Sequence, residues 1–264
     1  WILISDWDET ITTTDTLHLV AEAAYEANHN VKLVPWADLS TAYVRDYTAY
    51  SHSFGPRTTI DRELEFLKAI RNVEIDSINR VEKACIFKNV KLEGLQKAAQ
   101  KLTVRPGFNH VLDRCRNLKI RTAIMSVNWS CMFIQAAMQS RYGDCEDVDV
   151  YANEIEFSAT GVGTGKLNAG QYSLKTGYDK LQLLKHLRGD RKVLYLGDSS
   201  GDLHPLLEAD VGIIMGSKKS LLDTCNRIGI TVKSIREAAP LISVTKKKDD
   251  EHILYNINDW QELV

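Results

Sequence analysis

The 264-residue sequence lacks three features, each of which would have marked a specialised class of protein. No run of apolar residues approaches the roughly 18 that cross a bilayer, so no membrane-spanning segment or membrane partner is expected. Positive charge is not in excess, because 33 Lys and Arg residues stand against 35 Asp and Glu residues, which argues against a nucleic-acid partner. No internal repeat is visible, and a composition of 44% hydrophobic and 26% charged residues excludes disordered, collagen-like and solenoid chains.

The cysteines also lack a pattern that would give them a structural or metal-binding role. There are five, an odd number, widely spaced and without a C-x-x-C pair. Buried reduced thiols are therefore expected, which favours a reducing, cytoplasmic location. The chain starts at Trp1 and enters a strand at once, so we expect the natural chain to extend upstream, where a targeting segment could lie.

Three short apolar runs have the composition of buried strands, and each ends in polar residues. They are residues 2–5 before Asp6, residues 120–125 before Ser126, and residues 193–196 before Gly197 and Asp198. Each run is followed by a plausible helix, and this alternation predicts a parallel α/β sheet of the Rossmann-like kind. Because ligands bind beyond the carboxyl ends of such strands, the three polar ends should meet in one crevice.

A long helical segment separates the first of these strands from the second. About ninety residues lie between them, whereas an ordinary α/β connection has roughly 2–6. The sequence therefore predicts two domains, an α/β core of residues 1–14 and 104–264 and an inserted, all-helical cap of residues 15–103. Arg105, Pro106 and Gly107 fit the return to the core.

Aromatic residues recur at helical spacing within the predicted cap. Tyr43, Tyr47 and Tyr50 are four and three positions apart, which favours packing between helices. All three also remain candidates for contact with a ligand held beneath the cap.

Two carboxylates, Asp6 and Asp8, follow the first strand. Such neighbours repel each other unless one is protonated or a cation lies between them. A hard divalent ion with oxygen ligands, such as Mg²⁺, meets this need and would keep Asp6 ionised. A helix N-cap acid with an incidental acidic neighbour is the plainer alternative.

A second acidic pair, Asp198 and Asp202, follows the third strand. Two acidic clusters at the ends of strands that the fold brings together are hard to obtain by accident. The sequence therefore favours a metal site made by Asp6, Asp8, Asp198 and Asp202.

The same residues supply the parts of a phosphoryl-transfer site. Asp6 would attack phosphorus, and Asp8 would protonate the leaving oxygen and later deprotonate water. Ser126 would bind a phosphoryl oxygen, and Lys180 would offset the negative charge, with Lys175 as a close rival.

Plainer explanations exist for the supporting residues. Ser126 could be a turn hydroxyl, and either lysine could be a solvated helix residue. Cys131 could in principle be a thiol nucleophile, but no histidine partner is visible and apolar packing is favoured.

Taken together, the motifs resemble those of the haloacid dehalogenase (HAD) superfamily. The sequence reads D-W-D-E-T-I-T at residues 6–12, M-S-V-N at 125–128 and G-D-S-S-G-D at 197–202, with a lysine between the last two. A helical insert between the first two motifs resembles the subgroup with a helical C1-type cap, and residues 152–165 are similar to the phosphoserine phosphatase branch. A closer likeness, at residues 36–40, 179–182 and 197–216, is to the plant phosphatase domain that acts on thiamine monophosphate.

The resemblance implies a Mg²⁺-dependent phosphomonoesterase that works through an aspartyl phosphate. It implies that Asp6 is the nucleophile and Asp8 the acid/base. Mg²⁺ would be held by Asp6, Asp198 and the backbone carbonyl of Asp8, with Asp202 supporting the site. It also favours Lys180 as the phosphate-binding lysine.

One departure and several alternatives accompany this resemblance. Glu9 stands where many members have a small residue, so its influence on substrate choice is open. The candidate substrate-binding residues are Thr10 and Asn128 in the core and Tyr43 and Tyr47 in the cap. Thiamine monophosphate is the sharpest substrate hypothesis, and phosphoserine, phosphocholine-like and nucleotide monoesters compete with it. The functional alternatives are a catalytically idle module that senses a phosphometabolite, and hydrolytic dehalogenation. The sequence predicts no oligomeric state.

Overall fold

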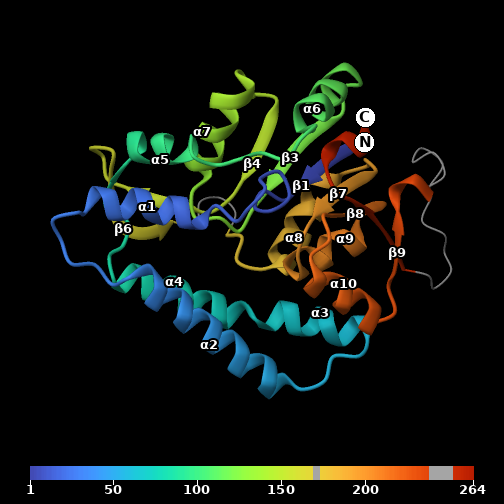
Figure 1. Ribbon diagram of the computed structural model, residues 1–264, viewed down its shortest axis with the longest axis horizontal. Coiled ribbons are helices and arrows are strands. Elements are labelled where there is room, and N and C mark those ends of the chain that lie inside the picture. The colour runs from blue at the N-terminus through green and yellow to red at the C-terminus, as the bar shows by residue number, and fades with distance from the viewer. Residues whose placement is uncertain (169–172, 238–251) are drawn as a thin grey trace.

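The computed structural model describes residues 1–168, 173–237 and 252–264 (Figure 1). Its centre is a seven-stranded sheet in the order β4-β3-β1-β7-β8-β10-β9, and all neighbouring strands run parallel. The strands are β1 (Ile2–Ser5), β3 (Arg121–Met125), β4 (Val148–Tyr151), β7 (Val193–Gly197), β8 (Val211–Met215), β9 (Thr231–Ser234) and β10 (Ile253–Ile257). The predicted Rossmann-like α/β fold is confirmed.

β1 lies at the centre of this sheet, between β3 and β7. All four of its residues are buried. Leu3 belongs to the hydrophobic cluster on one face of the sheet, and Ile2 and Ile4 belong to the cluster on the other. Since side chains alternate along a strand, a run that is apolar at successive positions suits a strand covered on both faces.

Helices cover the two faces of the sheet. The helices α6 (Phe108–Asn117) and α7 (Cys131–Tyr142) share a hydrophobic cluster on one side. The other side is covered by α8 (Gly177–Arg188), α9 (Leu203–Glu208) and α10 (Lys219–Arg227). Short 3₁₀ turns complete these layers at η1 (Ser200–Asp202), η2 (Ile235–Glu237) and η4 (Trp260–Leu263).

The insert after β1 is mostly helical. It contains α1 (Leu17–Ala27), α2 (Trp36–Phe54), α3 (Ile60–Ala69), α4 (Arg71–Lys83) and α5 (Leu92–Ala99). The expectation of an all-helical insert needs one correction, because β2 (Lys88–Lys91) is a strand. It pairs with β6 (Val162–Asn168), which pairs in turn with β5 (Glu154–Phe157), in a small antiparallel sheet.

β2 gave no strand signal in the sequence for a simple reason. Only Val90 of its four residues is buried, and the other three are exposed and polar. Its partner β6 lies far along the chain, so the pairing depends on tertiary packing that a local pattern does not contain.

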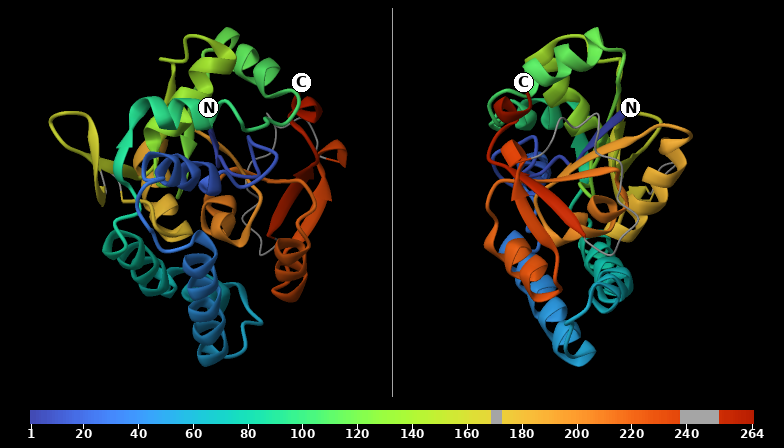
Figure 2. Two further views of the ribbon diagram at one scale, coloured as in Figure 1. Left: turned by 60° about the vertical axis from the view of Figure 1, so that its left-hand side comes forward. Right: turned by 90° about the vertical axis from the view of Figure 1, so that its right-hand side faces the viewer.

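The inserted helices fall into two groups. The apolar residues of α1 and α5 share one cluster with α7 and therefore pack against the core. The helices α2, α3 and α4 form a separate layer beside the core (Figures 1 and 2). We propose that residues 15–103 form a cap domain, and that α2, α3 and α4 are the part of it that covers the substrate.

Two ion pairs fasten this layer to the core. Arg71 of α4 pairs with Asp179 of α8. Arg227 of α10 donates to Glu63 of α3 at 3.0 Å. The cap in this structure is therefore docked on the core.

Across the three described stretches of the chain, no helix is both long and apolar enough to cross a membrane.

Candidate active site

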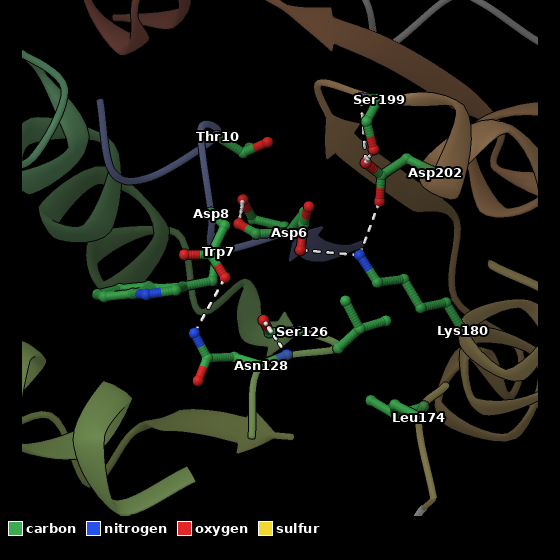
Figure 3. Close-up of polar contacts among 12 residues, drawn as sticks. Asp6, Trp7, Asp8, Thr10, Ser126, Asn128, Leu174, Lys180, Ser199 and Asp202 are labelled. Atoms are coloured by element: carbon green, nitrogen blue, oxygen red, sulfur yellow. Dashed lines mark hydrogen bonds and ion pairs between the residues drawn. The ribbon is translucent and has the colours of Figure 1, made fainter. Parts of the chain in front are cut away.

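Asp6 leaves the end of β1 at the centre of the site. Its backbone N–H donates to the carbonyl of Leu196 on β7 at 2.9 Å, which fixes the turn that follows the strand. Its side chain is buried, and its carboxylate lies 2.8 Å from the ammonium nitrogen of Lys180 (Figure 3). The sequence-predicted nucleophile and the predicted phosphate-binding lysine therefore lie in direct contact.

Lys180 bridges two carboxylates. Its ammonium also lies 2.8 Å from Asp202. Burial alone would lower the pKa of Lys180, but the charges of Asp202 and Asp6 outweigh burial and raise that pKa above its ordinary value. The lysine therefore stays charged. The rival Lys175 lines the cavity described below and contacts the Ser173 hydroxyl.

Asp202 is held from several directions. One oxygen accepts hydrogen bonds from Lys180 and from the Tyr195 hydroxyl at 2.7 Å. The other accepts from the backbone N–H groups of Asp198 and Ser199 at 3.3 Å. Burial opposes ionisation of Asp202, but these donors, Lys180 foremost, hold its pKa below the usual range.

Three acids gather at this point. Asp6, Asp198 and Asp202 are all buried, and each places one carboxylate oxygen within 4.8 Å of the others. Burial, followed by the charge of Asp202, raises the pKa of Asp6 well above its usual value and that of Asp198 to about 7. The amino groups nearby do not fully offset the three carboxylates. A hard divalent cation fits this set of oxygen donors.

Asp8 has a different environment. Its carboxylate points toward Asn128, whereas that of Asp6 points toward Lys180 (Figure 3). It accepts hydrogen bonds from the Thr16 backbone N–H at 2.6 Å, the Thr16 hydroxyl at 2.5 Å and the Asn128 amide at 3.1 Å. Burial, followed by the charge of Asp15, raises the pKa of Asp8 to about 6. A carboxyl group with this pKa can both donate and accept a proton near neutral pH.

The remaining predicted core residues lie close to these acids. The Ser126 hydroxyl, buried just beyond β3, accepts the backbone N–H of Asn128 at 3.0 Å. Asn128 directs its side-chain amide to Asp8 and Thr16. The Thr10 hydroxyl donates to Asp198 at 3.3 Å.

Two contacts of the acidic cluster were missed by sequence reasoning. Thr16 holds Asp8, and only its place before α1 hinted at a capping role. Lys218 contacts Asp198 at 3.0 Å and Glu9 at 2.5 Å. It follows β8, so the rule that ligands gather beyond strand ends could have found it, had that rule been applied to a fourth strand.

A cavity of about 390 Å³ separates the cap from the core. On the core side it is lined by Val127, which follows Ser126, and by Ser199, which follows Asp198. Tyr43 and Tyr47 line the cap side. Tyr50 instead stacks on Phe66, with ring centroids 5.8 Å apart, so this tyrosine packs within the cap as the helical spacing favoured.

Comparison with known proteins gives two relatives that match nearly the whole chain and a third that matches most of it. A CTO1 family protein of Schizosaccharomyces pombe is 29% identical over 98% of this chain and 96% of its own length. The bifunctional TH2 protein, mitochondrial, of Arabidopsis thaliana is 25% identical over 99% of this chain but only 48% of its own, so the chain spans about half of that relative. Cold tolerance protein 1 of Saccharomyces cerevisiae is 26% identical over 78% of this chain and 75% of its own.

Solved structures share the fold at low identity. A phosphoserine phosphatase in apo form superposes with a TM-score of 0.52 and 16% identity, covering 99% of this chain and 96% of that one. Cytosolic 5'-nucleotidase IIIB bound to cytidine has a TM-score of 0.54 and 13% identity, covering 86% of this chain and 77% of the other.

The family model described as haloacid dehalogenase-like hydrolase matches residues 3–207. Because that match takes in all four motifs and most of the chain, the chain belongs to the haloacid dehalogenase-like hydrolases.

Proposed function

We propose that the protein is a magnesium-dependent phosphomonoesterase that hydrolyses a small phosphorylated metabolite through an aspartyl phosphate, an acyl phosphate formed on Asp6. The observation that carries this proposal is the contact of the buried Asp6 carboxylate with Lys180, beside two further buried acids. A catalytically idle module that only sensed a phosphometabolite would not need a carboxylate nucleophile beside the ammonium group.

The reaction would proceed in two displacements. An Asp6 oxygen attacks phosphorus, the bond to the leaving oxygen breaks, and Asp8 gives that oxygen its proton. Asp8 then takes a proton from water, whose oxygen attacks phosphorus, so that inorganic phosphate leaves and the Asp6 carboxylate is restored. Lys180 and the Ser126 hydroxyl would hold phosphoryl oxygens during both steps.

The acids at the strand ends would hold the metal ion. Asp6 and Asp198, the backbone carbonyl of Asp8 and, in support, Asp202 are the proposed ligands. When bound, Mg²⁺ would offset the charge that the carboxylates and the phosphoryl group concentrate in one place. Thr10 would orient Asp198 through their hydrogen bond, and Asn128 would orient Asp8.

The cavity supports a small substrate. A volume of about 390 Å³ accommodates a metabolite but no macromolecule. Thiamine monophosphate is our sharpest candidate, because Tyr43 and Tyr47 line the cap wall and offer faces for stacking on its rings.

All five cysteines are free thiols, which supports our proposal of a reducing, cytoplasmic setting.

Hydrolysis of p-nitrophenyl phosphate tests the proposal. We expect turnover with Mg²⁺, complete loss with EDTA, and a loss of at least about a thousandfold in Asp6→Asn. Asp223→Asn, an exposed acid on α10, is the matched control and should keep full activity. Turnover that survived EDTA or Asp6→Asn would reject the proposal. Absence of turnover on every phosphomonoester, with stabilisation by one of them, would favour the idle sensing module. Chloride release from a haloacid would favour dehalogenation.

A further inference from the structure

The cap wall of the cavity carries a carboxylate without a cationic partner. Glu74 lies in the first turn of α4 and lines the cavity. It accepts a hydrogen bond from the Tyr43 hydroxyl at 2.7 Å. Among the residues that the structure describes, no lysine, arginine or histidine pairs with it.

A second acid of the cap, Glu63, contrasts with Glu74. Glu74 is half-buried, whereas Glu63 on α3 is fully buried and pairs with Arg57 and Arg227, each at 3.0 Å. The chain therefore neutralises the acid that fastens the cap to the core and leaves the acid that faces the cavity without a counter-charge. A carboxylate partly withdrawn from water without a positive counter-charge is costly, so such a site favours a ligand that brings the missing positive charge.

The surroundings of Glu74 suit a cation rather than a second anion. Four aromatic residues line the same cavity, namely Trp36, Tyr43, Tyr47 and Trp129. Aromatic faces attract cations, most strongly when water is excluded. Burial raises the pKa of Glu74 to about 7, as expected of a carboxyl group with no positive charge beside it.

The other charged residues of the cavity wall do not reverse this preference. Asp15 adds a second acid, and its carboxylate accepts the backbone N–H of Leu17 at 2.9 Å. Among the described residues that line the cavity, Lys175 is the one base, and its ammonium contacts the Ser173 hydroxyl. Even without the acids at the strand ends, the cavity wall therefore carries more negative than positive charge.

We propose that Glu74, supported by Tyr43, determines specificity by selecting phosphomonoesters whose leaving alcohol carries a positive charge, preferably on or beside a flat or compact apolar group. This inference rests on the proposed phosphomonoesterase function and narrows its substrate class. It favours thiamine monophosphate and phosphocholine-like esters over nucleotide monoesters, and over phosphoserine, whose leaving group carries a carboxylate as well as an amine.

The test uses pairs of compounds that differ in charge but hardly in shape. Choline phosphate pairs with 3,3-dimethylbutyl phosphate, and thiamine monophosphate pairs with its 3-deaza analogue, whose ring carries no positive charge. In at least one pair, we expect the wild-type kcat/KM to be at least about tenfold higher for the ester whose leaving alcohol carries a positive charge. In Glu74→Gln, which keeps an acceptor for Tyr43, this ratio should fall to about 2 or less.

Binding provides a readout that needs no turnover. Calorimetry with thiamine and 3-deazathiamine, the free alcohols, should show tighter binding of the charged compound by wild type and a reduced difference in Glu74→Gln. Asp76→Asn removes one exposed acid from the same helix and should keep both the preference and the p-nitrophenyl phosphate activity.

The outcomes separate this inference from the function on which it rests. If wild type hydrolyses p-nitrophenyl phosphate but prefers no charged member in kinetics or in binding, or if Glu74→Gln keeps the preference, the inference is wrong and the phosphatase stands. If wild type hydrolyses no phosphomonoester, the proposed function is wrong, and equal binding of the two alcohols would then overturn the role of Glu74 as well.

Discussion

Gly177, the first residue of α8, lies against the backbone of Gly201 in η1. A Cβ atom built on Gly177 would stand 2.1 Å from the Gly201 carbonyl oxygen, far inside van der Waals contact. This close approach brings the first turn of α8, and with it Lys180, to the loop that carries Asp202. The Lys180 contacts with Asp6 and Asp202 therefore depend on a residue that has no side chain of its own.

Gly177→Ala should displace α8 and weaken the site. We expect kcat to fall at least about tenfold and the free energy of unfolding to fall by about 1–3 kcal/mol, as for an overpacked contact. Gly94→Ala is the control, because a Cβ there meets nothing closer than 4.0 Å and the site lies within α5. That variant should be slightly more stable, by about 0.5–1 kcal/mol. Urea denaturation and steady-state kinetics measure both effects, and full activity in Gly177→Ala would contradict the argument.

Asp8→Asn should affect chemistry more than binding. The variant keeps an oxygen for the Thr16 bonds but cannot exchange a proton, so kcat should fall by about 100-fold or more while KM changes little. The loss should be greater for alkyl phosphates than for p-nitrophenyl phosphate, whose leaving group needs less help from an acid. An equal loss of kcat for both kinds of ester would indicate that Asp8 does not protonate the leaving oxygen.

The strand-end residues could be predicted from the sequence because their signal is local. Asp6, Ser126 and Asp198 each follow a short apolar run, and parallel strands deliver such ends to one edge. The sequence favours Lys180 over Lys175 because Lys180 lies in the first turn of a predicted helix, and the family resemblance strengthens that preference. The packing of α8 against η1 brings Lys180 to Asp202.

Residues whose role depends on the placement of the cap could not be predicted. Glu74 has the spacing of an ordinary acid in the first turn of a helix, and its position on the cavity wall follows from the way α4 docks on the core. Thr16 and Lys218 differ from Glu74: Thr16 lies eight positions after Asp8 in the turn that follows β1, and Lys218, which follows β8, was within reach of the strand-end rule.

Glu74 should make the stability of the protein depend on pH. Its pKa is about 7 in the folded protein, against an ordinary 4.5, so between these values the folded state holds more protons than the unfolded one. Stability should therefore fall as pH rises from about 5 to 8, by on the order of 2 kcal/mol from this group. Glu74→Gln lacks that loss and should exceed wild type in stability at pH 8 but not at pH 5.

Chemical denaturation at several pH values measures this effect. Asp76→Asn is again the control, and its stability relative to wild type should not change between pH 5 and 8. If Glu74→Gln were less stable than wild type at every pH, Glu74 would be acting mainly as a favourable acid at the N-terminus of α4. That result would also weaken the case for a cation subsite.

Mg²⁺ should stabilise the folded protein through the three acids. At a free concentration of 100 times the dissociation constant, the expected gain is about 2.7 kcal/mol, seen as a higher melting temperature. Asp198→Asn should abolish the Mg²⁺-dependent part of this shift, whatever its effect on the metal-free protein. Sodium chloride at the same ionic strength is the control. An equal Mg²⁺ shift in wild type and Asp198→Asn would place the ion elsewhere.

The central claim is that Asp6 forms a covalent bond to phosphorus. Acid quenching during turnover, followed by proteolysis and mass spectrometry, tests it most directly. We predict a gain of about 80 Da, the mass of one phosphoryl group, on the peptide that contains Asp6, and no such gain in Asp6→Asn. Rapid turnover with that peptide unmodified at every quench time, or with the added mass on another residue, would contradict the account.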